Sequence, residues 1–360
     1  MTGSLRLTSR KNDVTKQQLI TDLTKIGVTR GDHLAVTLSL NAIGHVVGGP
    51  ETLIDALVET VGPEGTVMMN TYTRTFPIYA IDEEFVFDSE RTVCWTGIVP
   101  ETLRKRKNAI RSNNPVCSVV AIGKKAEYLT RDHLNSSLHV PYERLAKING
   151  KYLAIGLGNE LVAIRHQAQR QAGLCQLLER PNAVRYRDPA EKIKLFIFNE
   201  APCTKSIQGI VPLMESAKVL ERGKIGNASA WIASAREFLD YLTHTLKRNP
   251  ATSLCQDPYC LWCREIERKL NLYGQIGKPR YFQKSRIIRE AIALGNHIRL
   301  KKYSYISFRN SALSTFWFPI PIFGFVLNGV RENLPWTIVD LLKLRPRFDF
   351  NPRIQPEDIQ

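Results

Sequence analysis

The chain contains 360 residues, of which 43% are hydrophobic and 23% are charged. This composition is typical of a globular protein and excludes a disordered, fibrous or collagen-like chain. The formal net charge of +16 and the pI near 9.6 favour anionic partners, such as nucleic acid, acidic lipid or a phosphorylated cofactor. A highly basic proteome would produce the same bias, so the charge alone selects none of these partners.

No segment has the pattern of a membrane helix or a secretory signal. The longest nearly apolar run, residues 316–330, is interrupted by two prolines, two glycines and an asparagine, whereas a spanning helix needs about 18–20 apolar residues. The N-terminal residues lack the apolar stretch of a signal peptide. We therefore expect a cytoplasmic protein. Seven cysteines, an odd number, then favour free thiols or metal ligands over a disulfide framework.

In chain order, the residues before about 250 alternate between helical and strand patterns. Thr15 is a typical N-cap and Gly27 a typical helix stop, and Pro50 opens a helix at the position that proline prefers. The expected helices cover residues 15–27, 51–61, 96–107, 126–129, 162–178 and 229–246, and the expected strands cover 33–40, 65–69, 116–122, 152–157 and 194–198. This alternation predicts an α/β fold with a layered mixed β-sheet flanked by helices.

The character of the sequence changes after residues 247–253. From Pro250 to the end there are 17 Lys+Arg against 9 Asp+Glu, and three cysteines and many aromatic residues occur close together. We therefore predict two parts: residues 1–249 form the α/β domain, and residues 250–360 form a smaller, Cys-rich and basic C-terminal module.

Cys255, Cys260 and Cys263 form a C-x4-C-x2-C pattern. A C-x2-C pair places two thiolates on one face of a tetrahedral zinc site. Three thiolates need a fourth ligand, for which Cys203 and His244 are the candidates. We predict a structural zinc at this cluster. An iron–sulfur cluster and three unliganded thiols remain as alternatives.

Basic and aromatic residues alternate in segment 278–308. Such a stretch can stack bases and bind phosphates. More often it is a solvated face whose aromatic side chains turn into the core. Nucleic-acid binding through the C-terminal module is therefore an alternative function and not the leading one.

The loop after the first long strand contains Gly44, Gly48 and Gly49 and ends at Pro50. A helix that starts at a Gly-Gly-Pro sequence leaves backbone N–H groups free at its positive end, which suits phosphate groups. Glycine also lets a ligand approach the backbone closely. A plain strand-to-helix turn is the alternative.

Several segments resemble, in order and spacing, the aminoglycoside 3-N-acetyltransferase family, also called the antibiotic N-acetyltransferases. The resemblance extends over about residues 15–247 and rests on the collinear series rather than on one motif. The segments that carry it are GDHLAVTLSLNAIGHVVGGPETLIDAL, GPEGTVMMNTYT, FDSERTVCWTGIVPETLR, RSNNPVCSVVAIG, LTRDH, PYERL, GKYLAIGLG and ERGKIGNASAWIASAREFLDYL.

This resemblance implies transfer of acetyl from acetyl-CoA to an amine of an aminoglycoside, an amino sugar or a related compound, without a metal in the reaction. It also implies a CoA-side role for Ser39, Leu40, Gly48 and Gly49. The family motif begins with His-Ser where this chain has Thr37-Leu38. The cationic composition suits CoA better than a polycationic aminoglycoside.

His166 stands at the position of the family's catalytic histidine. The family places a threonine three residues before that histidine and an acidic residue three residues after it, whereas this chain has Ala163 and Gln169. Positions 163, 166 and 169 share a helix face. A glutamine can orient the imidazole but cannot compensate its charge, so we expect a slow enzyme with His166 as base and Gln169 as its partner. A buried core histidine is the alternative.

Several other positions allow more than one interpretation of the site. Asn114 stands where the family often has histidine, and Glu101 and Arg104 form either a surface ion pair or part of a site. The candidates for a carboxylate in place of the missing acid are Asp32, Asp88, Glu101 and Glu160. The main alternative to an enzyme is a non-catalytic binding or scaffold protein on the same fold.

Overall fold

The computed structural model describes residues 13–77, 81–157, 163–177, 182–198, 203, 210–255, 260–270 and 272. These residues divide into two compact units. The first contains a seven-stranded sheet with its helices, and the second contains a four-stranded sheet. Of the C-terminal module predicted at 250–360, only the first residues are described, so the predicted boundary stays a prediction.

The seven-stranded sheet is mixed and has the order β12-β13-β9-β2-β4-β8-β7. At its centre β2 pairs in parallel with β9 and with β4, whereas all the outer pairs are antiparallel. The strands are β2 (His33–Leu38), β4 (Thr66–Asn70), β7 (Ile110–Arg111), β8 (Val119–Gly123), β9 (Lys151–Ile155), β12 (Leu220–Ile225) and β13 (Ala228–Ser234). The predicted mixed α/β sheet is therefore confirmed.

Helices α1 (Lys16–Lys25), α3 (Gly49–Val61) and α4 (Ile98–Arg104) cover one face of this sheet. Side chains of a strand alternate between the two faces, and every second residue of the central strands joins this aliphatic core. The core includes Leu34, Val36, Val67, Met69, Leu153, Ile155, Ile232, Leu19, Leu23, Leu53, Leu57 and Leu103, all buried. Thr15 caps α1, since its hydroxyl accepts from the Gln18 amide at 3.2 Å.

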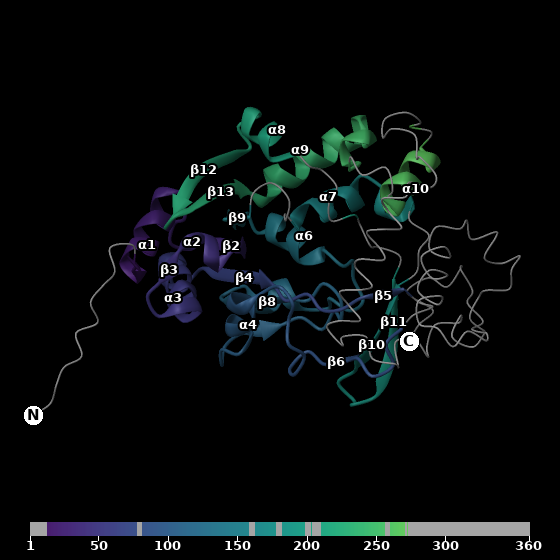
Figure 1. Cartoon of the computed structure of the whole chain (residues 1–360), viewed down its shortest axis with the longest axis horizontal. Coiled ribbons are helices and arrows are strands. Elements are labelled where there is room, and N and C mark those ends of the chain that lie inside the picture. Colours follow the sequence, from purple (N-terminus) through teal and green to yellow (C-terminus); the bar gives the residue numbers. More distant parts are fainter. Residues whose placement is uncertain are drawn as a thin grey trace, which may run out of the picture. The chain divides into compact units, whose positions relative to one another are not determined.

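Helices α6 (Val140–Lys147), α7 (Ile164–Gln171) and α9 (Ala235–Arg248) lie together beside the sheet and pack on one another (Figure 1). The strand residues that alternate away from the aliphatic core meet these helices, and they include aromatic and polar residues such as Tyr152, Trp231 and Thr37. Tyr152 and Trp231 stack at 5.5 Å between ring centroids, and Phe238 of α9 lies 6.0 Å from Trp231. This face of the sheet carries the candidate site.

The first unit also contains short elements at the ends of the strands. They are β1 (Asp13–Val14), β3 (His45–Val46), α2 (Leu40–Ile43), α5 (Ala126–Thr130), α8 (Ile210–Ser216) and the 3₁₀ turns at Cys175–Leu177 and Pro250–Ser253. The second unit's sheet comprises β5 (Phe76–Pro77), β6 (Val86–Phe87), β10 (Asn182–Arg187) and β11 (Ile193–Phe198), with β10 paired to the other three. Helix α10 covers Leu261–Lys269.

Two sequence expectations differ from the structure. The helix predicted at 229–246 begins only at Ala235, because Ala228–Ser234 is strand β13 between β12 and β9. Residues 230–233 are all buried, so the period of two that marks a half-exposed strand is missing. The helix predicted at 162–178 ends at Gln171, since Gly173 has φ +81° and stops it. No helix in the described ranges is long and apolar enough to cross a membrane.

Candidate active site

The tyrosine at position 152 joins the central sheet to helix α7. Its hydroxyl oxygen lies 2.6 Å from the hydroxyl of Thr37 on β2, and it accepts a hydrogen bond from the backbone N–H of Ala163 at 3.3 Å. Ala163 is the N-cap of α7 and has no side-chain acceptor for the helix N–H groups. The Tyr152 hydroxyl therefore anchors the helix start where the family's threonine is missing.

Helix α7 carries His166 and Gln169 one turn apart. Nδ1 of His166 lies 2.7 Å from Oε1 of Gln169, and both residues are buried. An amide oxygen only accepts hydrogen bonds, so Nδ1 donates and carries the ring proton. This tautomer leaves a lone pair on Nε2, which no other described residue engages. The atom that can accept a proton is therefore Nε2, on the side of the ring away from Gln169.

A second histidine, His139, lies against the first. It is the N-cap residue of α6, its ring centroid lies 5.2 Å from that of His166, and only 3% of its surface is exposed. The ring centroid of Tyr142, on the same helix, lies 6.5 Å from that of His139. The Tyr142 hydroxyl donates to Oδ1 of Asn70 at 2.5 Å. A chain of rings therefore runs from the sheet to the two imidazoles.

Both histidines of the pair are buried, with 3% of His139 and 8% of His166 exposed. Burial, assisted by the neighbouring Arg165, lowers the pKa of His166 to about 3. Burial, together with His166, His133, Arg170 and Arg165, holds the pKa of His139 well below its usual range. Within the described ranges no carboxylate hydrogen-bonds either ring. Both imidazoles are therefore neutral at physiological pH.

The carboxylates considered from the sequence are engaged elsewhere. Asp32 binds Lys151 at 2.8 Å, and Asp88 accepts hydrogen bonds from the backbone of Glu90 and Arg91. Glu160 lies outside the described residues. None of these carboxylates that the structure describes therefore balances a positive charge on the His166 ring.

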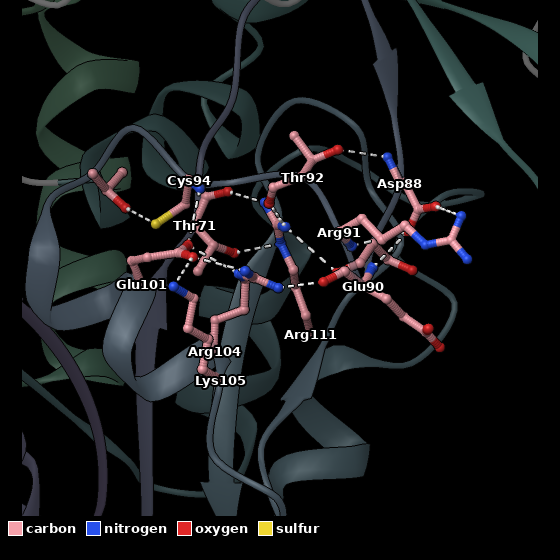
Figure 2. Close-up of polar contacts among 12 residues, drawn as sticks. Thr71, Asp88, Glu90, Arg91, Thr92, Cys94, Glu101, Arg104, Lys105 and Arg111 are labelled. Carbon is pink, nitrogen blue, oxygen red and sulfur yellow. Dashed lines mark hydrogen bonds and ion pairs between the residues drawn. The ribbon is translucent and has the colours of Figure 1, made fainter.

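Glu101 and Arg104 form an ion pair that is buried and not at the surface (Figure 2). The guanidinium contacts both carboxylate oxygens, at 2.7 and 2.9 Å, and the Cys94 amide also donates to Glu101. The hydrogen bond from Arg104 lowers the pKa of Glu101 to about 2. Arg111, beside this pair, donates to the hydroxyl and carbonyl oxygens of Thr71, which ties strand β7 to the segment after β4.

Asn114, at the family's histidine position, has a structural role. Its Oδ1 accepts from the backbone N–H groups of Val116 and Cys117, and its Nδ2 donates to the carbonyl of His133. His133 itself is completely buried, with Nε2 bonded to the Leu138 carbonyl and Nδ1 to the Ser112 hydroxyl. Both of its ring nitrogens are therefore satisfied.

The predicted CoA-side residues occupy the loop between β2 and α3. Ser39 is the N-cap of the short helix α2, which begins at Leu40, and its amide donates to the Ile155 carbonyl at 2.9 Å. Gly48 and Gly49 both have positive φ, +83° and +64°, at the start of α3. A Cβ at Gly48 would lie 2.2 Å from the Thr52 hydroxyl, so the loop needs glycine there.

The four cysteines predicted as metal ligands come together. The sulfur atoms of Cys203, Cys255, Cys260 and Cys263 all lie within 4.8 Å of one another. His244, the other candidate for a fourth ligand, is exposed on α9 and does not belong to this group. A tetrahedral site with Zn–S bonds of about 2.3 Å would place its sulfurs about 3.8 Å apart, so the cluster fits a four-thiolate metal.

Sequence reasoning missed His139 as the neighbour of His166, Tyr142 as the neighbour of His139, and the contact of Tyr152 with Thr37 and the start of α7. The two tyrosines lie in PYERL and GKYLAIGLG, which belong to the family resemblance but gave these tyrosines no role. His139 had no signal, because a single histidine before a proline-started helix is unremarkable in a sequence.

Residues 35–247 match the family described as aminoglycoside 3-N-acetyltransferase. Among curated proteins, aminoglycoside N(3)-acetyltransferase VII of Streptomyces paromomycinus is 29% identical over 258 residues, which is 63% of this chain and 90% of the relative. Aminoglycoside N(3)-acetyltransferase VIII of Streptomyces fradiae is 34% identical over 179 residues, 44% of this chain and 62% of the relative.

Solved structures of the same class share the fold. The structure of AAC-IIIb in a binary complex with CoASH has a TM-score of 0.56 at 25% identity and covers 66% of this chain and 97% of that chain. The apoenzyme of AAC(3)-IVa has a TM-score of 0.61 at 24% identity, covering 71% and 97%. The chain therefore belongs to the aminoglycoside 3-N-acetyltransferase family, whose members use acetyl-CoA.

The buried histidines predict a protein that loses stability in mild acid. The folded pKa values of His133, about 4, His139 and His166, about 3, lie below the value near 6.5 of an unfolded histidine. The unfolded chain therefore binds more protons below pH 6.5, and stability falls as the pH falls. At pH 5 each histidine should remove about 2 kcal/mol.

Thermal melts at pH 7.5 and pH 5 test this expectation. His133→Gln should reduce the loss of melting temperature between the two pH values, whereas substitution of the exposed His244 by glutamine should leave it unchanged. Equal melting temperatures at both pH values would show that the three histidines are not buried in the neutral form.

Proposed function

We propose that the chain transfers the acetyl group of acetyl-CoA to an amine, with His166 as the general base and Gln169 as its orienting partner. The observation that carries the proposal is the hydrogen bond from Nδ1 of His166 to Gln169, which leaves the Nε2 lone pair available. The family membership supports the substrate class, since members use acetyl-CoA.

In this reaction the amine nitrogen attacks the thioester carbonyl while Nε2 of His166 takes its proton. The C–N bond forms, the C–S bond breaks, and the proton passes to the departing sulfur to give the CoA thiol. The base has to be neutral when the amine arrives, and burial keeps His166 neutral throughout the physiological range. The same burial makes it a weak base, so the proposed enzyme is slow.

The acceptor that suits this site carries little positive charge. Arg165 and Arg170 are the charged groups that act on the histidine pair, and both repel cations. Because both arginines lower the pKa of these histidines, a further positive charge next to the pair is disfavoured, which applies most to a polycationic aminoglycoside. We therefore propose an amino sugar or another amine of low charge as the natural acceptor.

Binding of CoA is the first test of the proposal. The loop with Ser39, Leu40, Gly48 and Gly49 is the proposed CoA-side segment, and a ligand that binds only the folded state raises its melting temperature. Millimolar CoA should stabilise the chain by several degrees. Gly48→Val should weaken this effect, because its side chain would clash with Thr52, whereas Gly173→Ala, away from the loop, should not. No stabilisation by CoA would refute the enzyme.

Substitutions on α7 test the chemistry with an acceptor found by following thiol release. His166→Ala should lower kcat by about a hundredfold or more, the usual scale of a general base, and leave CoA binding intact. Gln169→Glu should raise kcat about tenfold or more by stabilising the imidazolium. Gln171→Glu is the matched control, since Gln171 bonds Thr243 and not His166.

Near-full activity of His166→Ala would refute the assignment of the base. Coenzyme binding without transfer to any amine would instead favour a binding or scaffold protein on the same fold. An unchanged rate of Gln169→Glu would mean that another group already compensates His166.

We also propose that Cys203, Cys255, Cys260 and Cys263 bind one zinc ion as a structural site. Four thiolates form a closed coordination shell, which is typical of structural and not of catalytic zinc. The sulfur atoms within 4.8 Å of one another support this ligand set. Zinc has no part in the proposed acetyl transfer.

Elemental analysis of protein purified without chelator should find about one zinc per chain. Cys260→Ser should lose the metal, whereas Cys94→Ser should keep it, because Cys94 lies outside the cluster and its thiol donates to the Gly97 carbonyl. Iron with visible absorption would indicate the iron–sulfur alternative. Protein without zinc or iron would show that the cysteines are free thiols.

A further inference from the structure

Two histidines of the same neighbourhood, His133 and His139, are buried in opposite ways. Both ring nitrogens of His133 have partners, the Ser112 hydroxyl at 2.8 Å and the Leu138 carbonyl at 2.9 Å. Nδ1 of His139 is buried as well, and no donor or acceptor of the described chain bonds it. His133 thus has the environment of a structural histidine, and His139 does not.

An unpaired buried polar atom weakens the fold, and removing it normally strengthens the fold. Such atoms need an explanation, and a role in a functional site is one of them. His139 lies where an explanation is available, because its ring faces that of His166 at 5.2 Å with 33° between the ring planes. The positive charges of Arg165 and Arg170 act on His139 as well, and they oppose a positive charge on its ring.

We propose that His139 is a positioning residue of the acetyl-transfer centre and takes over part of the work of the missing carboxylate. This inference rests on the proposed function of His166. While His166 is neutral, the ring of His139 packs beside it and helps to fix its orientation. When His166 holds the amine proton, the neutral imidazole of His139 turns the negative end of its dipole toward the new charge.

The electrostatic argument depends on His139 staying neutral. A neutral imidazole is strongly dipolar, and in a dry site a dipole acts at nearly full strength because little water screens it. Gln169 contributes one such dipole through its amide oxygen. His139 supplies a second from another element, the start of α6. His139 neither takes nor gives a proton in the transfer, so the proton balance of the reaction is unchanged.

If His139 is a positioning residue, its substitution should change activity and stability in opposite directions. A purely structural role does not predict this. His139→Phe keeps a ring beside His166 but removes both nitrogens and the dipole. We expect its melting temperature to rise by about 2–4 °C, since a buried unpaired nitrogen is lost. We expect kcat to fall about tenfold or more, with the KM for acetyl-CoA unchanged.

His139→Leu, which is closer in volume to histidine, is made alongside in case phenylalanine overfills the site. The matched controls are His133→Phe and His133→Leu. They remove two satisfied hydrogen bonds, so they should lower the melting temperature and leave kcat per folded molecule unchanged below the melt. We therefore expect the melting temperature to rise in the His139 variants and to fall in the His133 variants.

A kcat of His139→Phe within twofold of the original chain would overturn the proposal while leaving the proposed function standing. Loss of melting temperature in both His139 variants, equal to that of the His133 variants, would also overturn it, since His139 would then be structural. Failure of the unaltered chain to acetylate any amine would remove the proposed function, and the role of His139 with it.

Discussion

The hydroxyl of Tyr152 is the contact on which the candidate site depends. It connects the central strand β2, through Thr37, with the first backbone N–H of helix α7. Because the N-cap residue of α7 is Ala163, no side chain of the helix's own caps its first turn. The direction of α7, and with it the place of His166, follows from a tyrosine that is completely buried in the middle of the sheet.

That tyrosine can reach the helix because the two faces of the sheet differ. Strand residues such as Leu34 and Leu153 fill an aliphatic core under α1 and α3, and their neighbours in sequence turn to the opposite face. There Tyr152, Trp231 and Phe238 stack in series. Rigid rings leave little rotamer freedom, so the polar groups at their ends are held in fixed positions. Because side chains alternate along β2 and β9, one face of the sheet packs the aliphatic core and the other face carries the candidate site.

Much of this arrangement could be predicted from the sequence. The strand at 33–40, the helix that follows Pro50 and the hydrogen bond between positions 166 and 169 rest on local periodicity and helix geometry, which short segments determine. The strand at 228–234 was predicted as helix because its residues are buried by pairing with β9, which lies far away in the sequence. Likewise His139 and His166 are 27 positions apart, and only tertiary packing brings the two rings together.

The replacements around His166 form one consistent electrostatic change. The threonine, the acid and the second histidine of the family pattern are here Ala163, Gln169 and Asn114. A carboxylate at 169 would be a buried charge beside His166 and Arg165. Replacing it by an amide keeps the geometry and removes the cost of desolvating that charge. In the proposed reaction the site would then work with dipoles instead of charges, which suits the proposed uncharged base and acceptor of low charge.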